Sequence, residues 1–123
     1  MPSKADELGN RVKGFAVRVL KFVKTLPREP AVDGIARQLA RAGPSVSANY
    51  HSARRARSRA EFISRLAIVV DEADEAAGWC EALQKANLAS GPELDWLLGE
   101  AGELRAIFSH SVMTARANNK HHP

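Results

Sequence analysis

The residues of this sequence best suited to binding chemistry are arginines near the middle of the chain. Four arginines fall within residues 54–59, and two more lie one helical turn apart upstream. Because guanidinium groups match phosphate oxygens and are weakly hydrated, such residues can hold a nucleic-acid backbone without reading its sequence. The predicted nucleic-acid-binding residues are Arg37, Arg41, Arg54, Arg55, Arg57 and Arg59. The alternative is a solvated surface whose arginines pair with acidic residues of later segments.

Four other polar residues are predicted to have structural roles. Ser58 and Glu61 form the S-x-x-E pattern of a capping box, in which each side chain accepts a backbone N–H at the start of a helix. Asn49 falls on an apolar stripe, where a buried amide needs hydrogen-bond partners. Glu75 lies next to the stripe of the following segment, so it could reach inward to Asn49 or to an arginine.

The remaining reactive side chains do not match a catalytic or metal-binding pattern. A di-iron bundle needs Glu-x-x-His elements, whereas Glu72-x-x-Glu75 and Glu100-x-x-Glu103 have no histidine at the third step. The single cysteine, Cys80, falls on an apolar stripe and is predicted to be a packed thiol. Phosphate-loop and nucleophile-elbow motifs are missing from the sequence. We therefore expect no catalytic residue, no metal and no cofactor, and we do not expect an enzyme.

Three aromatic residues suit either packing or binding. Tyr50 lies close to the arginine run, where its ring could stack on a base or lie between subunits. Trp79 and Trp96 flank apolar stripes, which favours packing or a subunit interface over base stacking.

Composition limits the class of protein. The chain has 123 residues, 45% of them hydrophobic and 26% charged, which suits one folded domain. No apolar run approaches the ~20 residues of a membrane span, and no signal-peptide pattern is present, so a cytoplasmic protein is expected. Residues 1–65 hold 14 Lys/Arg and 5 Asp/Glu, whereas residues 66–123 hold 4 and 9. This asymmetry can serve nucleic-acid binding or complementary contacts between subunits.

Apolar residues recur at steps of three and four, which is the pattern of amphipathic helices. The stripes cover residues 8–26, 32–56, 62–83 and 94–115. In the second, we expect a kink or brief break near Gly43-Pro44, because proline removes an amide donor. No alternation typical of strands occurs. The sequence predicts an all-α protein, an antiparallel up-down-up-down four-helix bundle, in one domain over residues 1–118 with a disordered tail over 119–123.

Several stretches carry a resemblance to a known family. Residues 45–50 read Ser-Val-Ser-Ala-Asn-Tyr, and residues 54–63 follow the pattern Arg-x-x-Arg-Ser-x-x-Glu-Phe-Ile. Downstream, an acidic segment at 72–75 precedes Trp79, and residues 103–108 read Glu-Leu-x-Ala-Ile-Phe. From about residue 15 to residue 116, the sequence resembles the bacterial four-helix bundle proteins first noticed as reading frames in 23S rRNA intervening sequences.

The resemblance implies a left-handed bundle that assembles as a ring-shaped homopentamer and is not an enzyme. The chain is also distantly similar to the accessory proteins of diversity-generating retroelements, which are pentameric barrels that bind nucleic acid and a reverse transcriptase. The implied partners are further copies of this chain, RNA or DNA, and a protein such as a reverse transcriptase, with no membrane. We expect a homo-oligomeric accessory protein that binds nucleic acid. The alternative is a structural or protein-binding scaffold whose arginines serve subunit contacts.

Overall fold

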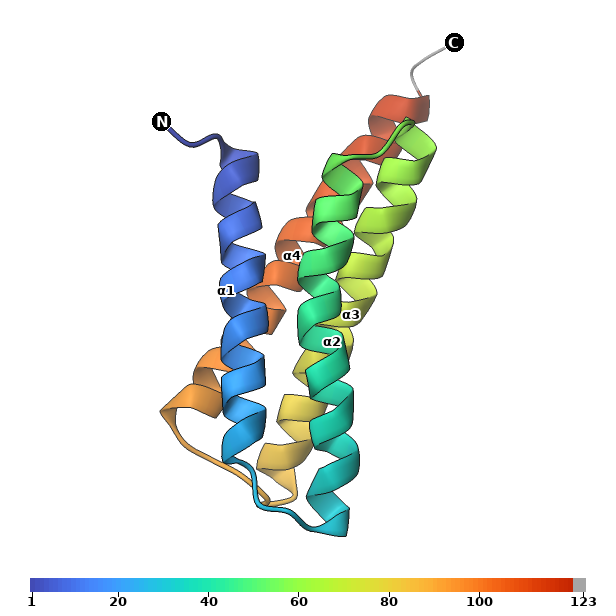
Figure 1. Cartoon of the computed structure of the whole chain (residues 1–123). Helices are drawn as coiled ribbons and strands as arrows, with labels where there is room; N and C mark the ends of the chain where they lie inside the picture. The colour runs from blue at the N-terminus through green and yellow to red at the C-terminus, as the bar shows by residue number, and fades with distance from the viewer. Residues whose placement is uncertain (121–123) are drawn as a thin grey trace.

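The computed structural model describes residues 1–120, and this part of the chain forms helices and no strand. The four helices are α1 (Lys4–Thr25), α2 (Pro30–Arg54), α3 (Arg59–Lys85) and α4 (Pro92–Lys120). Successive helices run in opposite directions and are joined by short turns (Figure 1). The predicted all-α, up-down-up-down bundle is thereby confirmed. Most of the predicted tail, residues 121–123, lies outside the described residues.

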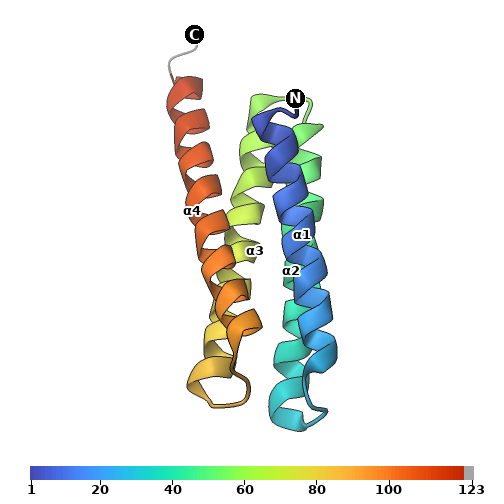
Figure 2. The same ribbon diagram turned by 90° about the vertical axis from the view of Figure 1, so that its left-hand side faces the viewer.

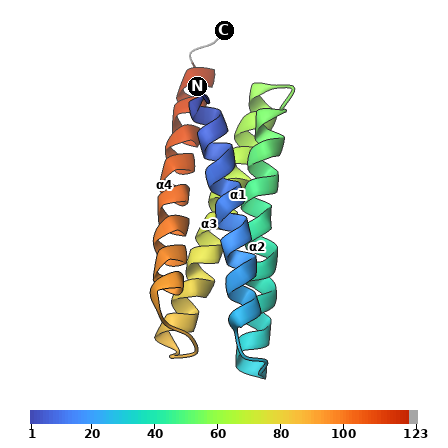
Figure 3. The same ribbon diagram turned by 60° about the vertical axis from the view of Figure 1, so that its left-hand side comes forward.

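The helices pack as two hairpins placed side by side. Figure 2 shows α1 lying along α2 and α4 lying along α3, and α2 and α3 join the two pairs through an extensive contact. Helix α1 meets α4 over a much shorter stretch, and Figure 1 shows the start of α1 well apart from the end of α4. In the view of Figure 3, α1 lies in front, between α4 and α2. None of the described helices is long and apolar enough to span a membrane.

Local sequence explains where the helices begin. Ser3 caps α1 in a reciprocal capping box with Asp6. Ser58 caps α3 as predicted, because its Oγ accepts from the backbone N–H of Glu61 at 3.1 Å. The other half of the predicted box differs: the Glu61 carboxylate accepts from the backbone N–H of Arg57 at 3.0 Å, one residue before the cap. Glu61 therefore holds the turn that precedes α3.

Helix α2 continues through Gly43 and Pro44 without interruption. The brief break weighed for this position is not found, and a kink there remains a prediction. The structure gives Gly43 another role. A Cβ at this position would lie 2.8 Å from both Cβ and Cγ1 of Val19, so the missing side chain lets α2 approach α1 closely.

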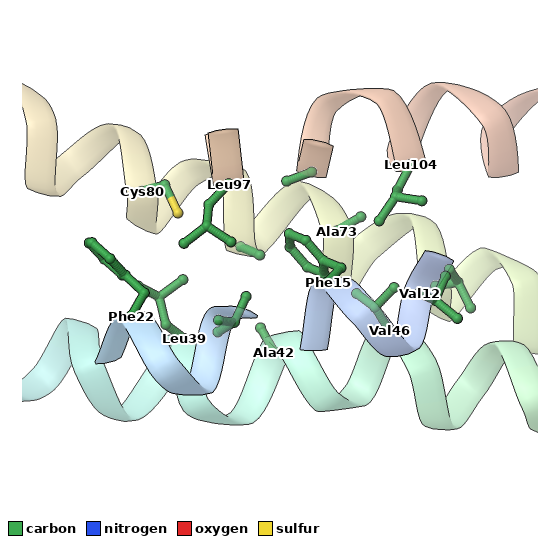
Figure 4. Packing of buried hydrophobic residues seen from close by; sticks show 14 of the residues in the cluster. Val12, Phe15, Phe22, Leu39, Ala42, Val46, Ala73, Cys80, Leu97 and Leu104 are labelled. Carbon is green, nitrogen blue, oxygen red and sulfur yellow. The ribbon is translucent and has the colours of Figure 1, made fainter. Parts of the chain in front are cut away.

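The four apolar stripes meet in one core (Figure 4). Figure 4 shows Phe15 and Phe22 of α1 packed among side chains of the other helices, with Cys80 among them. The Cys80 thiol is fully buried, and this burial raises its pKa to about 11. A thiol with such a pKa stays protonated at neutral pH, so Cys80 is a packing residue, as predicted.

Candidate nucleic-acid interface

The arginine run lies at the turn between α2 and α3. Arg54 is the last residue of α2 and Arg59 the first of α3, so the fold places this turn at the end of the bundle that also holds the start of α1 and the end of α4 (Figure 1). Arg55, Arg57 and Arg59 are exposed there. The turn exposes them because Ala53, Leu66 and their neighbours on the stripes are the residues that face the core.

Arg54 is engaged within the bundle. Its Nη2 donates to Oδ1 of Asp6 at 3.0 Å, which joins the end of α2 to the start of α1. The bond from Arg54, together with the capping bond from Ser3, lowers the pKa of Asp6 below its usual value. Arg54 is therefore a structural residue, unlike its neighbours in the sequence.

The two upstream arginines do not extend the same surface. Arg41 contacts the carboxylates of Glu72 at 3.0 Å and Glu75 at 2.7 Å, so it joins α2 to α3. The bond with Glu75 raises the pKa of Arg41 and lowers that of the glutamate. Arg37 is exposed, but it lies eighteen residues before Arg55, or about 27 Å along the helix axis. The structure therefore does not bring all six predicted arginines together on one surface.

Arg65, which the predicted set omitted, does belong to the turn. It lines a hollow of about 530 Å³ together with Ser52, Arg55, Arg57 and Glu61. Its position four residues after Glu61 places both on one face of α3, a spacing that the sequence already contained. We call Arg55, Arg57, Arg59 and Arg65, with Lys4 and Arg116 of the neighbouring helix ends, the basic end of the bundle.

Both a protein family and a solved structure match this chain. The profile of the 23S rRNA-intervening sequence protein family matches residues 7–110. The chain belongs to this family. It is also 27% identical to a protein of unknown function from the S23 ribosomal protein family of Bacteroides thetaiotaomicron, whose crystal structure superposes with a TM-score of 0.81. That match covers 90% of this chain and 99% of the other. No curated protein matches.

In this member of the 23S rRNA-intervening sequence protein family, Tyr50 lies in the core. Its side chain is 5% exposed, its ring centroid is 5.1 Å from that of Phe108, and its hydroxyl donates to the carbonyl of Ala5 at 3.0 Å. Burial raises the pKa of the phenol. Both roles suggested for Tyr50, base stacking and a subunit interface, are therefore wrong, because α1 and α4 cover the ring.

The tryptophans are likewise occupied by contacts within the subunit. The guanidinium carbon of Arg18 lies 3.4 Å from the ring centroid of Trp96, a cation–π contact, and Arg18 also binds Glu93. Trp79 Nε1 donates to Glu75 at 3.4 Å, which is a long hydrogen bond. Both tryptophans are partly buried and pack against the hydrophobic core, which is one of the two predicted roles, and a role in a subunit interface stays a prediction.

Asn49 and Glu75 separate into two unconnected roles. The half-buried Asn49 amide donates to the carbonyl and the hydroxyl of Ser45, one turn earlier in the same helix. Of the two partners proposed for Glu75, the structure selects an arginine, Arg41, and not Asn49. Asn49 is therefore a locally satisfied amide and not a link between helices.

The acidic residues of α4 also serve ion pairs. Nε and Nη2 of Arg11 donate to the two carboxylate oxygens of Glu100, each at 2.8 Å, and Nη2 contacts Glu103 at 2.7 Å. Within residues 1–120, no group of three or more His, Cys, Asp and Glu side chains is placed to hold a metal ion. The Arg11–Glu100 pair joins α1 to α4, which contact each other less extensively than the other adjacent helices do.

We expect this pair to shape the acid stability of the protein. The Glu100 side chain is 8% exposed, and its bond to Arg11 lowers the pKa of the carboxyl below its usual value of 4.5. A group with a lowered folded-state pKa stabilises the fold above its unfolded pKa and loses that contribution as pH falls through the folded value. Glu100→Gln should therefore lower the free energy of unfolding by about 1 kcal/mol at pH 7. At low pH, the variant and the parent should be equally stable.

The measurement is thermal unfolding of the parent and Glu100→Gln between pH 7 and pH 2.5. The melting temperatures of the two proteins should converge below pH 4.5, since protonation removes the charge that the variant already lacks. Glu7→Gln is the matched control, because Glu7 is an exposed carboxylate on α1, four residues before Arg11. A constant difference between parent and Glu100→Gln across this range would contradict the assigned role.

Proposed function

We propose that this protein is a non-catalytic, homo-oligomeric helical bundle, in a pentameric ring, that binds RNA or DNA backbones through its basic end. One observation carries the proposal: among the described residues, all arginines without an ion pair, except Arg37, lie at this end of the bundle. Apart from Arg37, the arginines away from this end are paired with carboxylates. Unpaired guanidinium groups gathered at one place repel each other and favour a polyanion.

The kind of contact follows from the side chains at this end. Arginine forks bind phosphate oxygens, whereas Tyr50, Trp79 and Trp96 are occupied within the bundle. Binding should thus depend on the backbone and on salt, with little preference among bases.

The oligomer and its setting are further parts of the proposal. The basic and acidic halves of the sequence suit a head-to-tail contact between copies, which closes a ring when the rotation permits. A protein partner such as a reverse transcriptase would engage this assembly. The buried free thiol of Cys80 agrees with a reducing compartment such as the cytoplasm.

The test combines size exclusion with light scattering and fluorescence anisotropy on labelled RNA and DNA duplexes at several salt concentrations. The parent should elute as an oligomer and bind both duplexes, and Arg55→Ala/Arg57→Ala should keep its mass and bind about tenfold more weakly. The double variant should also lower the slope of log affinity against log salt by about 2, one for each lost phosphate contact.

Arg37→Ala is the control variant. It removes an exposed arginine that has no ion pair among the described residues, but at the other end of the bundle, so it should bind as the parent does. A parent that binds neither duplex at low salt would contradict the proposal. Dissociation of the double variant into monomers would instead show that these arginines hold subunits together, which is the scaffold function.

A further inference from the structure

The hollow beside the α2–α3 turn brings together groups from both helices. Ser52 comes from the last turn of α2, Arg55 and Arg57 from the turn, and Glu61 and Arg65 from the first two turns of α3. Its volume is about 530 Å³, and hydroxyl, guanidinium and carboxylate groups line it. Residues separated by up to thirteen positions in the sequence thus share one concave surface.

The backbone around the hollow is held in place. The Glu61 carboxylate accepts from the N–H of Arg57 at 3.0 Å, and the N–H of Arg55 donates to the carbonyl of Ser52 at 3.1 Å. Ser58 caps α3 between them. Because these bonds fix the turn, the arginine side chains start from defined positions and need to order only their own rotamers when they bind a ligand.

The charges of the hollow fit a ligand with two negative charges. Three guanidinium groups and one carboxylate leave a net charge of +2. A phosphate monoester carries a charge of about −1.5 to −2 at neutral pH, and two consecutive backbone phosphates carry about −2. Arginine forks and a serine hydroxyl are both common donors to phosphate oxygens.

We propose that this hollow is a phosphate-binding site, with Arg55, Arg57 and Arg65 as its cationic groups and Ser52 as a neutral donor. The inference deepens the proposed function and rests on it for the source of the phosphates, which are either consecutive diesters of a nucleic-acid backbone or a terminal monoester. Of the arginine run, the site includes Arg55 and Arg57. Arg59 lies outside the site, because it lines an apolar groove with Leu8 and Phe62 instead.

Glu61 limits the affinity of the site in this proposal. Its carboxylate holds the turn through the N–H of Arg57, but it also offsets one positive charge of the hollow. Glu61→Gln keeps an oxygen that can accept from the same N–H and removes the negative charge. A variant with unchanged turn geometry and higher net charge should bind phosphate more tightly.

The experiment measures binding of inorganic tripolyphosphate by calorimetry and of labelled RNA duplexes by anisotropy. Arg65→Ala should weaken both about five- to tenfold, and Glu61→Gln should strengthen both about two- to threefold. Arg59→Ala should change the affinity for tripolyphosphate by less than about twofold, because Arg59 lines the neighbouring apolar groove and not the hollow. Duplexes with a 5′-phosphate and with a 5′-hydroxyl distinguish the two sources. A site for a terminal monoester should bind the 5′-phosphate duplex more tightly, whereas a site for backbone diesters should bind both duplexes equally. Circular dichroism checks that each variant is folded.

The possible failures are distinct. Equal losses of tripolyphosphate affinity in Arg59→Ala and Arg65→Ala would overturn the site, because they would indicate a diffuse basic surface. A parent that does not bind tripolyphosphate would overturn it as well. A parent that binds tripolyphosphate through Arg65 but neither RNA nor DNA would overturn the proposed function and leave the phosphate site standing.

Discussion

Replacing Phe108 with alanine is expected to lower the free energy of unfolding by about 4 kcal/mol. The side chain is 1% exposed, and its ring packs against Tyr50 of α2 with centroids 5.1 Å apart. Tyr50 in turn donates to the carbonyl of Ala5 in α1. Phe108 therefore begins a chain of contacts that joins α4 to α2 and α1, at the end of the bundle where α1 and α4 share little direct contact.

Urea denaturation at one fixed protein concentration measures this loss, since the stability of an oligomer depends on concentration. Met113→Ala is the control on the same helix. Met113 is 68% exposed, so its truncation should change the free energy by less than about 0.5 kcal/mol. A loss below about 1 kcal/mol for Phe108→Ala would show that the contacts of this ring do not hold α4 in the bundle.

The architecture could be predicted from the sequence because the buried residues of a helical bundle recur with the period of the helix. Apolar residues at steps of three and four mark the face of each helix that packs, and prolines and Ser58 mark where helices end and begin. Cys80 illustrates the strength of this signal. Its place on the stripe of the third helix was sufficient to predict a buried, unreactive thiol.

The binding surface could not be predicted as well, because the spacing of charged residues does not show which of them pair with residues of other helices. Arg54 and Arg55 are adjacent in the sequence, yet one binds Asp6 and the other lines the hollow. Their directions depend on the turn and on α1, which begins fifty residues earlier. Arg41 is similar, since its partners on α3 lie more than thirty residues away. Long-range ion pairs decide which arginines remain available for a ligand.

The pair Gly43-Pro44 shows the same limit for packing. The sequence predicts a disturbance of α2 from the proline, which acts locally. The requirement for glycine arises from Val19, on a different helix, and only the close approach of α1 and α2 reveals it. Glycine costs helix stability at most positions, so its presence in a helix interior often has a packing reason.

Gly43→Ala should therefore destabilise the fold by about 2 kcal/mol. The new Cβ would lie 2.8 Å from two atoms of the buried Val19, and inserting a methyl group into a packed core costs about 1–3 kcal/mol. The clash falls at the upper end of this range, because Val19 Cβ is fixed to its backbone and moves only with α1. The better helix propensity of alanine offsets this loss of stability by somewhat less than about 1 kcal/mol.

Gly14→Ala provides the control with the opposite sign. Gly14 is exposed in the interior of α1, and a Cβ there would have no neighbour within 4 Å. Only the propensity term acts, so this variant should be more stable than the parent by about 0.5–1 kcal/mol. Urea denaturation of both variants separates the two effects. If both substitutions stabilise the protein, then α1 and α2 do not depend on Gly43 for their close contact.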